Sequence, residues 1–141
     1  MHKNLNIIIC GIGGQGVIIL TRILANAALL ENYDVKTSEL HGLAQRGGSV
    51  ETHVRFGKKI YSPLIMPNQV DLIIDLTKPK KEFEKSALNG IFMLGYYCNK
   101  KIIPLKPSSI LKAIKKIVPE KYFKINKKIF KSACRLDNCT Q

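Results

Sequence analysis

LNIIICGIGGQGV, at residues 5–17, joins a short apolar run to a turn rich in glycine. The β-branched run at 5–10 predicts a strand that is buried on both faces of a parallel sheet. From Gln15 to Leu30, apolar residues recur at steps of three and four, which predicts a helix with one buried face. A strand, a glycine turn and a helix in direct succession indicate an α/β fold.

The alternation of strands and helices continues along the chain. Further strands are predicted at residues 33–38, 49–56 and 69–76. Helices with apolar stripes are predicted at 108–118, where Ser108 is placed to cap the start, and from Pro119 onward. We therefore predict a single domain over residues 1–141, with a three-layer α/β/α Rossmann-like sheet, mostly parallel, and C-terminal helices.

The charge of the chain is distributed unevenly. The 141 residues carry a net charge of +13, of which residues 1–57 contribute only +1. The remaining excess is nearly all lysine, placed singly or in pairs among apolar residues, without the aromatic residues or arginine clusters of a nucleic-acid platform. This pattern favours a solvated helix face and makes nucleic acid an improbable partner.

The four cysteines, Cys10, Cys98, Cys134 and Cys139, form no CxxC pair and no grouping at zinc or iron–sulfur spacing. We expect reduced cysteines in a cytoplasmic protein, with Cys10 and Cys98 acting as small apolar residues. No stretch approaches the ~20 apolar residues that a membrane span requires. The sequence therefore predicts a protein that is neither exported nor held in a membrane.

The glycine turn matches the pattern GxGxxG, directly after a strand and at the start of a helix. In this pattern Gly11 permits the tight turn, Gly13 lets a ligand approach the backbone, and Gly16 allows close packing of helix and strand. The helix N–H groups would face an anion, and Glu39 is placed to accept from a ribose hydroxyl. The predicted cofactor-binding residues here are Gly11, Gly13, Gly14, Gln15, Gly16 and Glu39. The alternative is that the glycines only form a steep turn.

The stretch ELHGLAQRGGS, at residues 39–49, is the second candidate. It is predicted as a loop between two strands that emerges at the same carboxyl edge as the glycine turn. Arg46 can bind a phosphate or a partner's carboxylate, and Gly47 and Gly48 offer backbone N–H donors beside it. We predict an interface through His41, Gln45, Arg46 and Ser49. We assign no nucleophile, general base or metal ligand.

The two motifs together carry a resemblance. GxGGQGV at 11–17, ILA at 23–25, ExHGxAQRGGSV at 39–50 and VR at 54–55 resemble the gamma subunit or domain of pyruvate and 2-oxoacid:ferredoxin oxidoreductases. Within this family the indolepyruvate:ferredoxin oxidoreductases are most similar. The resemblance runs from residue 5 to about 76 and resumes at 92–95 and 118–123.

The resemblance implies an assembly that decarboxylates a 2-oxoacid, here indolepyruvate or another aryl pyruvate, to its acyl-CoA while reducing ferredoxin. Thiamine diphosphate and [4Fe–4S] clusters would belong to a larger partner subunit, so this chain would hold no cofactor and would be inactive alone. Coenzyme A at the subunit interface would give the glycine turn and Arg46 a phosphate-bearing ligand.

The chain departs from this family pattern after its fourth strand. Family members usually add a strand–helix–strand unit there, where this chain has only residues 77–89. We therefore expect a sheet shortened after the fourth strand. Two other interpretations remain open: a non-catalytic nucleotide- or CoA-binding module, and a shortened remnant that acts only as an interaction protein.

Overall fold

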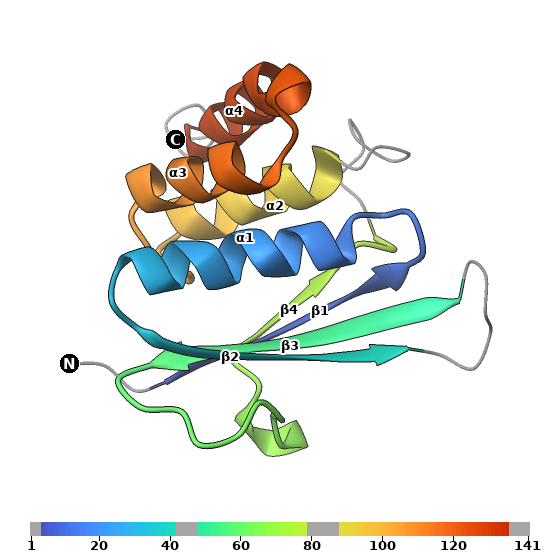
Figure 1. Cartoon of the computed structure of the whole chain (residues 1–141). Helices are drawn as coiled ribbons and strands as arrows, with labels where there is room; N and C mark the ends of the chain where they lie inside the picture. Colours follow the sequence, from blue (N-terminus) through green and yellow to red (C-terminus); the bar gives the residue numbers. More distant parts are fainter. Residues whose placement is uncertain (1–3, 42–47, 79–87, 136–141) are drawn as a thin grey trace.

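The computed structural model describes residues 4–41, 48–78 and 88–135. A mixed sheet lies on one side of the molecule and the helices lie on the other (Figure 1). In chain order the elements are β1 Leu5–Ile12, α1 Val17–Leu30, β2 Asp34–His41, β3 Ser49–Gly57, the 3₁₀ turn η1 Pro67–Gln69, β4 Leu72–Asp75, α2 Leu88–Asn99, α3 Pro107–Ile117 and α4 Glu120–Cys134.

The four described strands follow the order β2-β3-β1-β4. Only β1 and β4 pair in parallel, whereas β3 pairs antiparallel with both β1 and β2. The prediction of a mostly parallel sheet was therefore wrong. The reason is the connection between β2 and β3, which spans residues 42–48 and is too short for the crossover of a dozen or more residues that parallel neighbours require.

Helices α1, α2, α3 and α4 all lie on the same side of the sheet (Figure 1). Helix α1 packs on β1, β2 and β3, while α2 and α3 lie beside α1 and contact α4. The segment that contains η1 lies against the opposite face (Figure 1). The three-layer α/β/α prediction was wrong for the described residues, because the C-terminal helices pack on α1 and on one another. The α/β class, the open four-stranded sheet and the C-terminal helices are confirmed.

The boundaries of several elements differ from the predictions. β2 continues to His41, so residues 39–41 belong to a strand and not to a loop. β4 begins only at Leu72, because Pro67–Gln69 forms a 3₁₀ turn before it. Ser108 does not cap α3, because Lys106 occupies the cap position. Pro107 takes the first helical position, where a backbone N–H has no acceptor within the helix, so the N–H that proline lacks is not needed.

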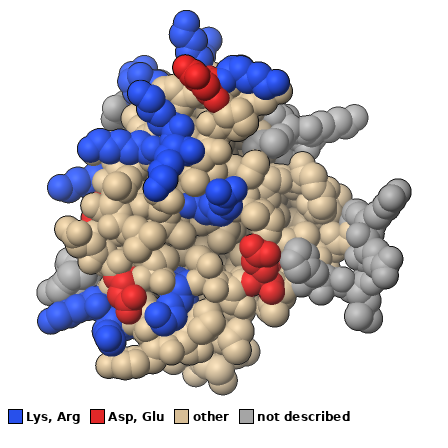
Figure 2. Space-filling view, in the orientation of Figure 1, with Lys and Arg blue, Asp and Glu red and all other residues tan. Residues whose placement is uncertain are grey.

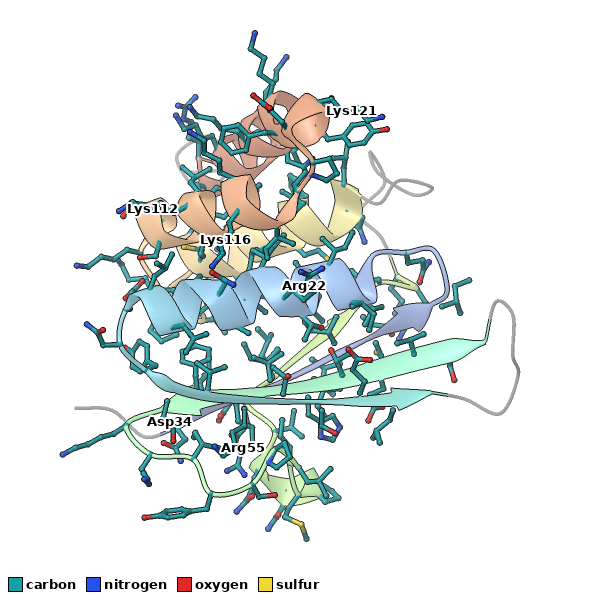
Figure 3. The ribbon with its side chains drawn as sticks, viewed as in Figure 1. Arg22, Asp34, Arg55, Lys112, Lys116 and Lys121 are labelled. Atoms are coloured by element: carbon teal, nitrogen blue, oxygen red, sulfur yellow. The ribbon has the colours of Figure 1, made fainter. Side chains whose placement is uncertain are left out.

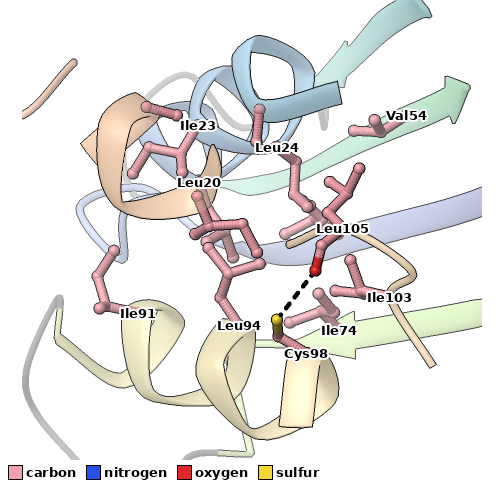
Figure 4. Close-up of a cluster of buried hydrophobic side chains, with 14 of the residues drawn as sticks. Leu20, Ile23, Leu24, Val54, Ile74, Ile91, Leu94, Cys98, Ile103 and Leu105 are labelled. Atoms are coloured by element: carbon pink, nitrogen blue, oxygen red, sulfur yellow. Dashed lines mark hydrogen bonds between the residues drawn. The ribbon is translucent and has the colours of Figure 1, made fainter. Parts of the chain in front are cut away.

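The core joins α1 and α2 to the sheet (Figure 4). Leu24, Ile74 and Leu94 have no exposed surface, and burial of each such side chain contributes about 1.5–3 kcal/mol. Cys98 is 6% exposed, and its Sγ donates to the carbonyl oxygen of Leu105 at 3.3 Å (Figure 4). The expectation that Cys98 behaves as a small buried residue is thus confirmed.

Two surface carboxylates fix the ends of strands and give a prediction for acid pH. Asp34, at the start of β2 (Figure 3), accepts the N–H of Ile60 at 2.8 Å, and Asp75 accepts the N–H of Thr77 at 2.9 Å. The hydrogen bond from Ile60 lowers the pKa of Asp34, and the bond from the Thr77 side chain lowers the pKa of Asp75.

A carboxyl group with a lowered pKa in the folded state stabilises the fold above its unfolded pKa, which is 3.8 for both residues. This contribution is lost as the pH falls through the folded pKa. We expect the thermal midpoint to begin to fall below about pH 5 and to go on falling below pH 3.8, toward the lowered folded pKa. Asp34→Asn keeps an acceptor for Ile60 but cannot titrate, so it should show a smaller fall by differential scanning calorimetry. An unchanged pH profile in Asp34→Asn would contradict the role of this carboxylate.

Candidate functional site

The glycine turn links β1 to α1, but its glycines have different roles from those predicted. Gly14 and Gly16 adopt positive φ angles of 89° and 85°, and Gly16 is the N-cap of α1. Gly11 lies inside β1, where a Cβ atom would come within 2.9 Å of Val17 Cγ2 and 3.2 Å of Leu76 Cβ. Gly11 therefore permits the close packing of helix and strand, while Gly14 and Gly16 form the turn.

Hydrogen bonds within the protein already use part of the turn. The N–H of Ile12 donates to Gln15 Oε1 at 2.8 Å, and the N–H of Gly13 donates to the carbonyl oxygen of Gly48 at 3.2 Å. The first bond of α1 runs from the N–H of Leu20 to the carbonyl oxygen of Gly16 at 3.0 Å. By helix geometry the N–H groups of residues 17–19 lack a partner within α1, and its first turn holds no acidic residue.

The glycine turn lies at the same edge of the sheet as the strand ends that flank the second loop, His41 and Ser49. Because β3 runs antiparallel to both neighbours, β1 and β2 end at the same edge, where Ser49 pairs with Ile12. The bond between Gly13 and Gly48 joins the turn to the end of the loop. Residues 42–47, which include Gln45, Arg46 and Gly47, lie outside the described residues, as does the side chain of His41.

Glu39 does not lie at the end of its strand. It is an exposed residue of β2 that pairs with Thr52 of β3, and β2 continues for two residues beyond it. In the register of the sheet it shares a face with Thr52, whose hydroxyl group bonds to Thr21 of α1 at 2.6 Å. Glu39 therefore lies on the helical side of the sheet. Its role toward a ribose hydroxyl stays a prediction.

A row of polar side chains on the opposite face was missed by the sequence reasoning. Glu51, His53 and Arg55 alternate along β3, and His53 is only 6% exposed. Its Nδ1 accepts the N–H of Ile65 at 3.2 Å, so its Nε2 carries the proton and donates to Glu51 Oε2 at 2.8 Å. The alternation in residues 50–56 was the available signal. These contacts hold the segment after β3 against the sheet.

Cys10, near the end of β1, and the possible metal ligands were the remaining candidates for a chemical role near the turn. Burial, and next the Asp75 carboxylate, raise the pKa of the half-buried Cys10 thiol, which makes it a poor nucleophile at neutral pH. No cluster of three or more His, Cys, Asp or Glu residues able to hold a metal ion occurs in residues 4–41, 48–78 and 88–135. Within the same ranges, each helix is too short or too polar to cross a membrane.

The turn and both loop-forming strands lie in the region that matches a known family. The family model described as pyruvate ferredoxin/flavodoxin oxidoreductase matches residues 6–79. The protein named "indolepyruvate oxidoreductase subunit IorB" from Archaeoglobus fulgidus is 41% identical over 100 residues, which are 71% of this chain and 49% of that protein. The chain thus matches about half the length of this relative.

Two solved structures share the fold. The gamma subunit of keto/oxoacid ferredoxin oxidoreductase from Geobacter sulfurreducens has a TM-score of 0.66 and 19% identity, over 93% of this chain and 96% of that chain. The 2-oxoglutarate:ferredoxin oxidoreductase from Magnetococcus marinus has a TM-score of 0.67 and 13% identity, over 96% of this chain but only 32% of that chain. Since the family model covers more than half of the residues, this chain belongs to the pyruvate ferredoxin/flavodoxin oxidoreductase family.

Proposed function

We propose that this chain is the small subunit of an indolepyruvate:ferredoxin oxidoreductase, or of an enzyme for another aryl pyruvate. The reaction is the oxidative decarboxylation of the 2-oxoacid to its acyl-CoA, with reduction of ferredoxin. The observation that carries the proposal is the 41% identity to a protein named as an indolepyruvate oxidoreductase subunit. The likeness to a gamma subunit over almost the whole chain supports it.

The catalytic cofactors belong to a larger partner subunit in this proposal. Thiamine diphosphate supplies the decarboxylation chemistry when bound there, and [4Fe–4S] clusters carry the electrons to ferredoxin. In the Magnetococcus marinus enzyme the matching fold is about a third of one long chain. A separate small subunit would take the place of such a domain and contact its partner through the loop at 41–49, with His41, Gln45, Arg46 and Ser49.

The glycine turn is proposed to bind an anionic group, such as a phosphate of coenzyme A. The N–H groups of residues 17–19, which have no acceptor within α1, and the lack of an acidic residue in the first turn fit this role. The Gly13 N–H does not contribute, since it donates to Gly48. Gly16, the N-cap of α1, would lie beside the bound anion. Arg46, Gly47 and Gly48 of the second loop would complete the site.

The test is reconstitution of the two subunits. We expect no 2-oxoacid-dependent dye reduction by this chain alone, and CoA-dependent reduction of ferredoxin when the larger subunit is present. Turnover by the isolated chain would overturn the assignment. A complex that binds CoA without turnover would instead favour the non-catalytic binding module.

A matched pair of variants at Gly14 belongs to the same experiment. Gly14 has a φ of 89°, which strains any other residue, but no atom of the described residues lies within 4 Å of an added Cβ. Asn and Asp are nearly the same size and are the residues that adopt positive φ most readily, so the strain should be similar in the two variants. Only Gly14→Asp places a negative charge at the start of α1. We expect it to raise the KM for CoA about tenfold while Gly14→Asn changes it little. Equal KM values would show that the glycine turn binds no anion.

A further inference from the structure

An apolar cavity of about 380 Å³ lies between α1, α2 and α4, next to the glycine turn. Its lining includes Ile19, Leu20, Ile91, Val118, Tyr122 and Ile125. Small-molecule sites in proteins have volumes of about 300–1,000 Å³, with a mainly apolar lining and a few polar groups. Tyr122 and Asn126 are the lining residues that carry polar side-chain atoms, and the Asn126 amide donates to the carbonyl oxygen of Tyr122 at 2.8 Å.

The mouth of this cavity exposes large apolar side chains. Ile19 is 45% exposed, Tyr122 is 49% exposed and Ile125 is 47% exposed. The sequence pattern predicts that Tyr122 and Ile125 belong to a packing stripe of α4, but the fully buried residue of that stripe is Phe130. Three half-exposed apolar side chains around one cavity form a patch that a ligand can cover.

The rim of the cavity is basic. The Lys121 Nζ atom lies 5.0 Å from the centre of the Tyr122 ring. Lys121 and Lys128 are exposed, and they lie four residues before and three residues after Ile125, which makes them its neighbours on the helix surface. Residues 106–135 contain ten lysine and arginine residues and a single acidic residue, Glu120.

The positive charge gathers over α3 and α4 (Figure 2). Lys121 lies at the start of α4, whereas Lys112 and Lys116 lie on α3 (Figure 3). In the described ranges, the structure records no ion pair for the lysines of α3 and α4. The lysines on this side of the molecule are therefore a source of positive field, which favours an anionic ligand.

We propose that this cavity binds a small aromatic anion, with its ring among Ile19, Ile91 and Ile125 and its carboxylate or sulfonate at Lys121 and Lys128. The volume and apolar lining fit a ring, and the basic rim fits its charge. The phosphate proposed above lies at the glycine turn, and this site does not depend on it or on the proposed reaction.

The experiment uses the full chain and three probes. Anilinonaphthalene sulfonate is titrated by fluorescence, and indole-3-acetate and neutral indole are titrated by calorimetry at low salt. We expect one sulfonate site per chain, displaced by indole-3-acetate, and weaker binding of neutral indole. Added salt should weaken only the two anions, because it screens exposed charges.

Two variants and their controls locate the site. Ile125→Asp should weaken anilinonaphthalene sulfonate binding about tenfold or more, whereas Ile102→Asp, at an apolar residue that is 42% exposed elsewhere, should not. Lys121→Gln with Lys128→Gln should weaken indole-3-acetate several-fold and leave indole unchanged. Lys112→Gln with Lys116→Gln is the control for total charge.

Three results would overturn the proposal. One is sulfonate binding that persists in Ile125→Asp, and another is equal affinity for indole and indole-3-acetate. The third is equal weakening by the two lysine pairs, since that would show a general charge effect. Because Ile125 is already half-exposed, Ile125→Asp should keep its far-ultraviolet circular dichroism and thermal midpoint, so a loss of binding reports on the cavity.

Discussion

Gly95→Leu is expected to destabilise this protein by about 3 kcal/mol, because it separates α2 from α4. A Cβ atom at Gly95 would lie 2.7 Å from the Phe130 carbonyl oxygen and 2.8 Å from Ala133 Cβ. Both contacts belong to the helix backbone or to an atom fixed to it, so α4 would have to move as a whole. We expect a thermal midpoint lower by roughly 10 °C, measured by circular dichroism.

Gly90→Ala is the matched control in the same helix. Its added Cβ would meet only side-chain atoms, Leu20 Cδ2 at 3.3 Å and Leu76 Cδ2 at 3.7 Å. These side chains can adjust, and alanine is favoured over glycine in a helix by about 1 kcal/mol. Gly90→Ala should therefore stay within about 1 kcal/mol of the parent protein. If Gly95→Leu is as stable as Gly90→Ala, the close approach of α2 and α4 is not required.

Arg55→Met is expected to destabilise the protein by about 2–3 kcal/mol and to release the segment after β3. The guanidinium of Arg55 (Figure 3) donates to Asn6 Oδ1 at 2.9 Å and to the carbonyl oxygens of Ser62 and Leu64 at 2.9 and 3.1 Å. Methionine replaces the aliphatic stem of arginine but removes the donors of all three hydrogen bonds. Urea denaturation would measure the loss of stability.

Arg55→Lys separates geometry from charge. A lysine ammonium keeps the charge, but it lacks the planar fork that reaches Asn6 and two carbonyl oxygens together. We expect an intermediate loss of stability, with faster amide exchange at Ile65, whose N–H bonds to His53 in the same segment. A lysine variant as stable as the parent would show that charge alone holds the segment.

The local elements could be predicted because each depends on its own periodicity. β1 and α1 follow from an apolar run, a glycine turn and apolar residues at helical steps. The direction of β3 could not be obtained in this way, since its buried residues fit a parallel or an antiparallel neighbour. The signal for this direction is the connection between His41 and Ser49, which is too short to contain a crossover helix.

The candidate site was predictable in its location but not in its atomic roles. The spacing from Gly11 to Gly16 correctly placed a turn between a strand and a helix. The bond from the Ile12 N–H to the Gln15 side chain depends on the path of the loop, and no residue pattern specifies it. The packing between helices could not be predicted from the residue pattern either. The apolar stripe of α4 does not reveal that Tyr122 and Ile125 border a cavity.

The place of β1 in the sheet has a consequence for biosynthesis. β1 lies between β3 and β4, yet it precedes both along the chain, and Ile7 pairs with Leu72. At about 5–20 residues per second, the nascent chain carries the uncharged run at 5–10 for several seconds before its last partner emerges. A β-branched segment left unpaired for that time invites strand pairing between neighbouring chains. The yield of this protein should therefore be limited by aggregation during translation more than by the stability of the finished fold.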